Sequence, residues 1–143
     1  MPDVHTSLVI AAPPERVWAV FTDFAAWPQW NSVFSRLRVE PRVGSTIRFR
    51  IKIEATPTLA FAARVVRCDE GRAFAWRGGA PLMPSLAWGE HWFEMEPTEG
   101  GTRFSHGERF GGLLALVMRG AVHARVTRTY DGFNRALKAR VEV

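Results

Sequence analysis

The sequence predicts an α+β domain in which a curved antiparallel sheet of about seven strands surrounds one long C-terminal helix. Two observations lead to this fold class: alternating apolar residues through the middle of the chain, and one apolar stripe at helical spacing near its end. The apolar face of the sheet is the only surface large enough to cover that stripe, and a twisted sheet curls naturally around a helix. With 143 residues, residues 1–143 fit a single domain.

The first elements are marked by prolines. Residues 4–11, "VHTSLVIA", predict a strand, which Pro13 and Pro14 end. Pro14 suits the first turn of a short helix, which we expect to end near Asp23. The next segment, "AAWPQWN", contains Pro28 and predicts a second short helix or a bend.

A run of antiparallel strands follows. The stretch "TIRFRIKIE" at 46–54 alternates apolar and charged residues, which is typical of a strand with one buried face. Further strands are predicted in "LAFAARVVRCD", "AFAWR", "LAWGEHWFEME" and "GTRFSHGERFGG", separated by turns rich in glycine and proline.

The chain ends in a predicted helix from Leu113 to Val141. Its apolar residues recur every three or four positions, which gives one buried stripe. Gly120 and Gly132 weaken a helix by about 1 kcal/mol each relative to alanine, and we interpret Gly132 as a site of close packing. The stripe consists of Val122, Val126, Tyr130, Phe133, Leu137 and Val141.

The last two strands carry polar residues on their predicted inner face. A tight turn at Glu99-Gly100 places Phe93 opposite His106 and His91 opposite Glu108. A slip of one residue would instead bury Trp88, Glu90 and Trp92 on the first of these two strands.

The expected register makes His91 and Glu108 a polar pair with His106 nearby. A buried carboxylate is costly unless it is paired, and three interpretations remain open. The pair is a structural anchor, it orients a ligand, or it performs general acid/base chemistry. A metal site would need a third ligand, and we expect neither a metal nor another cofactor.

Three stretches together resemble the START-like superfamily, also called the Bet v 1-like, SRPBCC or polyketide cyclase/dehydrase group. They are "VIAAPPERVWAVFTDFAAWPQWN", "GTRFSHGERFGGLL" and "FNRALKARVE", which span nearly the whole chain in order. The resemblance implies a helix-grip fold with a cavity between sheet and helix, and a hydrophobic ligand such as a lipid or polyketide. It transfers no catalytic residue, because the matched motifs are mainly structural.

The composition agrees with an aromatic-lined interior, since six Trp and ten Phe occur beside one Tyr. We expect a cavity that opens near the Trp27 to Trp30 segment and the "GGAPLMPS" loop at 78–85. The candidate ligand-binding residues are Trp27, Trp30, Phe49, Ile51, Phe74, Trp76, His91, Phe93, Phe104, His106, Glu108, Phe110, Val122 and Tyr130.

Three functions remain open on the sequence. The first is a module that binds a hydrophobic or aromatic small molecule; the second is a cyclase-like or dehydratase-like enzyme that uses the cavity His and Glu. The third, a partner-binding or nucleic-acid-binding module, would use the net charge of +5 and the basic face of Arg48, Arg50 and Lys52. We expect no nucleic acid, because that face is typical of a solvated strand and no run of five basic residues occurs. We expect a cytoplasmic protein without a signal peptide or stable membrane insertion, either monomeric or homodimeric.

Overall fold

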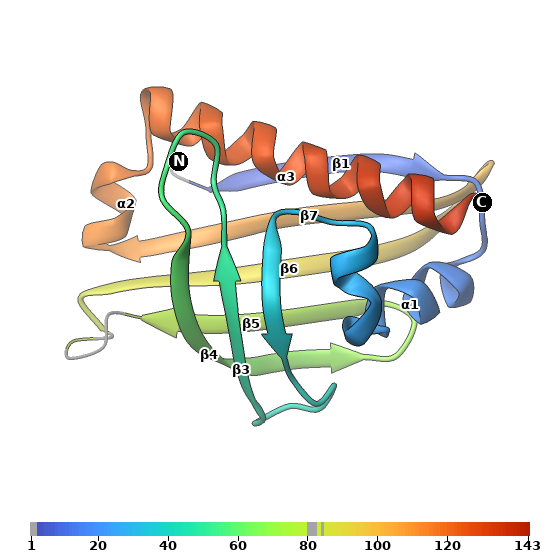
Figure 1. The fold of residues 1–143 in the computed structure, drawn as a ribbon, viewed down its shortest axis with the longest axis horizontal. Coiled ribbons are helices and arrows are strands. Elements are labelled where there is room, and N and C mark those ends of the chain that lie inside the picture. The colour runs from blue at the N-terminus through green and yellow to red at the C-terminus, as the bar shows by residue number, and fades with distance from the viewer. Residues whose placement is uncertain (1–2, 80–82, 84) are drawn as a thin grey trace.

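The computed structural model describes residues 3–79, 83 and 85–143, and there seven strands form one antiparallel sheet that curls around the C-terminal helix (Figure 1). The predicted fold class is confirmed. The strand order β1-β7-β6-β5-β4-β3-β2 joins the first strand to the last. The elements are β1 (Val4–Ile10), α1 (Pro14–Thr22), the 3₁₀ helix η1 (Phe24–Gln29), β2 (Phe34–Arg38), β3 (Thr46–Ile51), β4 (Leu59–Asp69), β5 (Ala73–Gly79), β6 (Ala87–Thr98), β7 (Gly101–Gly112), α2 (Leu113–Val117) and α3 (Gly120–Val141).

The C-terminal helix is interrupted, contrary to the prediction of one helix from Leu113 to Val141. The short helix α2 ends before Met118, and α3 begins at Gly120. Met118 (φ −85°, ψ 71°) and Arg119 (φ −155°, ψ 169°) leave the helical conformation between them, and Gly120, where α3 begins, has a φ of +58°, so the two helices are not continuous. None of the helices in the described ranges is long and apolar enough to cross a membrane.

The β6–β7 hairpin has the predicted register. Phe93 lies opposite His106 and His91 lies opposite Glu108, so the alternative shifted by one residue is excluded. Trp88 and Trp92 lie on the other face, where their rings cover Gly111 and Gly107 of β7. These contacts explain how two tryptophans occupy a face that is otherwise charged.

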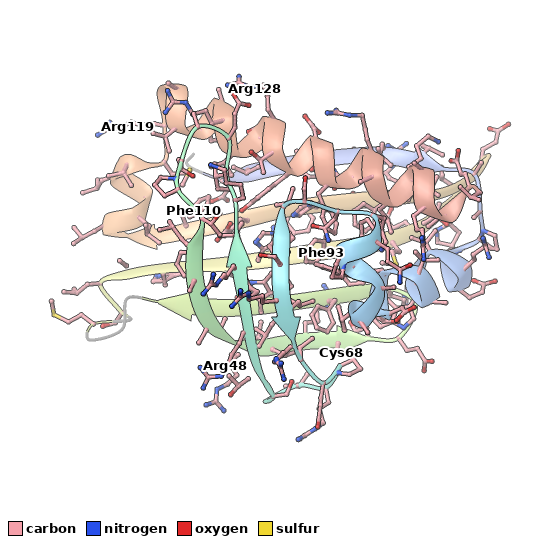
Figure 2. All side chains as sticks on the ribbon, viewed as in Figure 1. Arg48, Cys68, Phe93, Phe110, Arg119 and Arg128 are labelled. Carbon is pink, nitrogen blue, oxygen red and sulfur yellow. The ribbon has the colours of Figure 1, made fainter. Side chains whose placement is uncertain are left out.

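The core lies between the concave face of the sheet and the helices α1, η1 and α3. Phe21 of α1 packs against Phe93 with ring centroids 4.7 Å apart, and the indole N–H of Trp27 donates to the Phe21 carbonyl at 2.7 Å. Figure 2 shows Phe93 near the centre of the molecule, between the sheet and the helices. Phe133 of α3 packs against Trp27 with ring centroids 5.2 Å apart, so aromatic rings from all three helices cover this part of the concave face.

Candidate functional site

The candidate site is a chain of polar side chains that crosses this aromatic core. His91 Nε2 lies 2.6 Å from His106 Nε2, and His91 Nδ1 lies 3.4 Å from Glu108 Oε1. The pairing of His91 with Glu108, and the position of His106 beside them, are as predicted. They follow from the alternation of side chains along two strands in the register described above.

The most deeply buried end of this row of polar side chains contains two residues that the sequence interpretation missed. His106 Nδ1 lies 2.8 Å from Asn134 Oδ1, Asn134 Nδ2 donates to Thr6 Oγ1 at 2.7 Å, and the Thr6 hydroxyl donates to the His106 carbonyl at 2.7 Å. Asn134 follows Tyr130 by one helical turn inside the apolar stripe of α3. An amide at that position is the signal that would have located it.

The outer end of the chain is the Glu108 carboxyl, whose side chain is 17% exposed. The Tyr130 hydroxyl donates to its Oε1, and its Oε2 occupies the space beside Gly89 that a Cβ atom there would fill. Glu108 therefore stands between the dry core and the part of the concave face that solvent reaches.

Burial sets the charge of two members of the chain. It lowers the pKa of His106 well below 6.5, with a further contribution from the neighbouring His91 and an opposing one from the Asn134 hydrogen bond. It also raises the pKa of the Tyr130 phenol, and the Glu108 carboxylate raises it further. The His106 imidazole is therefore neutral, and the Tyr130 phenol keeps its proton.

Most predicted lining residues come together around this chain as packed rings. His106 stacks on Tyr130 and on Phe93 at centroid separations of 4.4 Å, and His91 stacks on Trp76 at 4.8 Å. These separations are those of rings in contact. The other predicted lining residues that are buried in this core are Trp27, Phe49, Ile51, Phe74 and Phe104.

Three predicted lining residues lie outside the fully buried rings: Trp30 and Phe110 pack at the margin of the core, and Val122 lies away from it. Val122 is 41% exposed, Phe110 is half-buried toward the α2 end (Figure 2), and Trp30 borders an open hollow of about 330 Å³ between η1, the β3–β4 loop and α3. Val122 is exposed in the first turn of α3, which begins only two residues earlier. Of the predicted opening at 78–85, residues 80–82 and 84 are outside the described residues.

The concave face is uncovered where β4 begins. Leu59 and Phe61 lie opposite the buried Ile51 and Phe49 of β3, so they face the same concave side. Each is nevertheless 49% exposed. An apolar strip of the inner sheet face is thus open to solvent at this end of the molecule.

The comparison with family models gives a match over residues 1–142 to "Polyketide cyclase / dehydrase and lipid transport". The chain belongs to this family. A relative from Streptomyces halstedii, named "Putative polyketide cyclase", is 31% identical over 74 residues, which are 50% of this chain and 57% of that protein. The match thus spans little more than half of the relative's length.

Solved structures with low sequence identity share the fold of this family member. The ZhuI aromatase/cyclase from Streptomyces sp. R1128 has a TM-score of 0.75 at 16% identity, covering 98% of this chain and 93% of that one. A protein of Thermus thermophilus, TTHA0849, has a TM-score of 0.75 at 18% identity, covering 98% and 97%. The Aha1 protein of Colwellia psychrerythraea, solved as a dimer, has a TM-score of 0.72 at 18% identity, covering 100% and 98%.

Proposed function

We propose that the protein binds a hydrophobic, ring-containing small molecule on the uncovered part of its concave face, with the polar end of the ligand at Glu108. The observation that carries the proposal is an inner surface almost free of side chains, formed by Ala63, Gly78 and Gly89, which we call the bare floor. A Cβ atom on Gly78 would lie 3.1 Å from the Ala63 Cβ, and Gly78 pairs with Gly89.

The bare floor joins two features that suit such a ligand. At one side lies the exposed ring of Phe61, two residues before Ala63 on the same face of β4. At the other side lies the Glu108 carboxyl, beside Gly89. A flat ring system suits a floor of glycine and alanine because these residues themselves bring nothing larger than the Ala63 methyl group. The Glu108 carboxylate, which lies over Gly89, accepts a hydroxyl hydrogen bond from the ligand.

A pair of probes tests this proposal directly. We expect isothermal titration calorimetry to show 2-naphthol binding roughly tenfold more tightly than naphthalene, since a hydrogen bond to a charged group contributes about 1.5–3 kcal/mol. Glu108→Gln should reduce this preference to within about threefold, because the amide retains a weaker acceptor.

Glu96→Gln is the matched control, because Glu96 is exposed on the other face of β6, and it should leave both affinities unchanged. Equal affinity of the wild-type protein for the two probes contradicts the proposal. Unfolding of Glu108→Gln in the circular dichroism spectrum assigns Glu108 to structure instead of ligand recognition.

A second candidate function is proton transfer to or from a bound ligand. The specific observation is the contact between two titratable groups, His91 and Glu108, at the edge of the bare floor. A carboxylate there can take the proton from a carbon next to a carbonyl, leaving an enolate, and return it as the carboxylic acid.

The ketone 2-tetralone distinguishes the enzyme from the binder. An enzyme accelerates exchange of its C1 protons for deuterium in D₂O, followed by proton NMR, and Glu108→Gln abolishes the acceleration while the fold is kept. A pure binder gives the same exchange rate with and without protein.

A further inference from the structure

We infer that Asn134, oriented by Thr6, fixes His106 in its Nδ1–H tautomer and so directs one exchangeable proton to the contact between His91 and Glu108. The inference concerns positioning residues of the site described above. Its consequence for a ligand rests on the proposed function, whereas the tautomer itself does not. It follows from the donors and acceptors in the chain, taken in order.

A backbone carbonyl fixes which group donates at each hydrogen bond of this polar network, because a carbonyl only accepts hydrogen bonds. The Thr6 hydroxyl has one hydrogen, and it donates this hydrogen to the His106 carbonyl. Thr6 Oγ1 therefore accepts from the amide nitrogen of Asn134. The amide oxygen is left facing His106 Nδ1, so that nitrogen carries the hydrogen.

The same assignment of donors and acceptors extends from His106 through His91 to the Glu108 carboxylate. A neutral His106 with its hydrogen on Nδ1 has a lone pair on Nε2, so at their 2.6 Å contact the hydrogen belongs to His91 Nε2. A neutral His91 then presents its Nδ1 lone pair to the Glu108 oxygen 3.4 Å away. Two acceptors face each other there unless one proton lies between them.

The surroundings leave this proton no other place. Among the described residues, the other aromatic rings that pack against His91 are those of Phe34, Trp76 and Phe93 and the tilted ring of Tyr130. The Tyr130 phenol already donates to Glu108. The proton is therefore held at the contact between His91 and Glu108, on one group or the other, beside the bare floor where a ligand would accept it or take its place.

Long-range ¹H–¹⁵N correlation spectra of histidine-labelled protein test the assignment, because they distinguish protonated from unprotonated ring nitrogens. In the wild-type protein we expect His106 to be protonated at Nδ1 alone and His91 to be protonated at Nε2. Asn134→Leu removes the acceptor, so we expect loss of the Nδ1–H signal of His106, a hydrogen on its Nε2, and a hydrogen on His91 Nδ1.

Thr6 supplies the matched pair of variants. Thr6→Val has the same shape without the hydroxyl, which frees the Asn134 amide to rotate and should weaken the Nδ1–H signal; Thr6→Ser keeps the hydroxyl and should keep the signal. If Asn134→Leu fails to fold, the Thr6 pair decides.

Two results overturn the inference: a wild-type His106 protonated at Nε2, or an unchanged tautomer in both Asn134→Leu and Thr6→Val. A purely structural amide would lower stability in these variants without moving the hydrogen. If the protein bound 2-naphthol no more tightly than naphthalene, the proposed function would be contradicted. The tautomer assignment would remain intact.

Discussion

The polar residues of the site differ in how visible they are in the sequence. His91 and Glu108 were predicted because strand alternation and a tight turn place them opposite each other. Asn134 and Thr6 were not, because each fits its element without a partner: Thr6 suits a strand, and Asn134 interrupts a helical stripe that remains apolar on average. Their role depends on the contact between β1, β7 and α3, which no local pattern contains.

The buried His106 predicts a loss of stability in mild acid. The unfolded chain takes up a proton on this residue near pH 6.5, whereas the folded protein does not, because burial lowers the pKa of the ring. The unfolded state is therefore favoured as the pH falls below that value. Between pH 7.5 and pH 5.5 this one group lowers the free energy of unfolding by about 1.4 kcal/mol.

Urea denaturation of the wild-type protein and of His106→Gln at these two pH values isolates this contribution. The variant should lack it, whatever its own stability. Equal pH dependence in the two proteins would show that His106 takes up a proton in the folded state.

At the scale of the element, the α2–α3 break shows what apolar spacing leaves undetermined. The stripe from Val126 to Val141 correctly identified the buried face of α3, whereas the break before it depends on the backbone of residues 118–120. Gly132 was interpreted as a site of close packing, and this is wrong. A Cβ atom there has no neighbour nearer than the Arg135 Nη2 atom at 3.8 Å.

Gly132→Ala should therefore stabilise the protein. Alanine is favoured over glycine in a helix interior by up to about 1 kcal/mol, and here no contact opposes the added methyl group. Thermal unfolding by circular dichroism measures the change. Gly111→Ala is the contrasting variant, because its methyl group would collide with the Trp88 ring and should destabilise the fold. A destabilised Gly132→Ala would mean that the hollow beside Trp30 closes against this helix.

At the scale of the molecule, the sequence predicted that the sheet curls around the helix. It did not predict which part of the concave face the helices leave uncovered. The concave face closes over most of its length because α3, α1 and η1 fill it with rings. It stays open where β4 begins, since Leu59 and Phe61 face the concave side there and are each 49% exposed. The predicted residues therefore describe the sealed core better than the exposed surface.

The exposed ring of Phe61 provides the test at this scale. If the ligand lies on the bare floor, Phe61→Ser removes an aromatic contact of about 0.5–1.5 kcal/mol and should weaken 2-naphthol binding about three- to tenfold in calorimetry. The free energy of unfolding should change by less than about 1 kcal/mol, because the ring is 49% exposed.

Val43→Ser is the control, since Val43 is 61% exposed between β2 and β3, and it should leave the affinity unchanged. Unchanged affinity in Phe61→Ser, together with a loss in Glu108→Gln, would instead place the entry at the hollow beside Trp30, because Phe133 lines that hollow and its ring packs against His106.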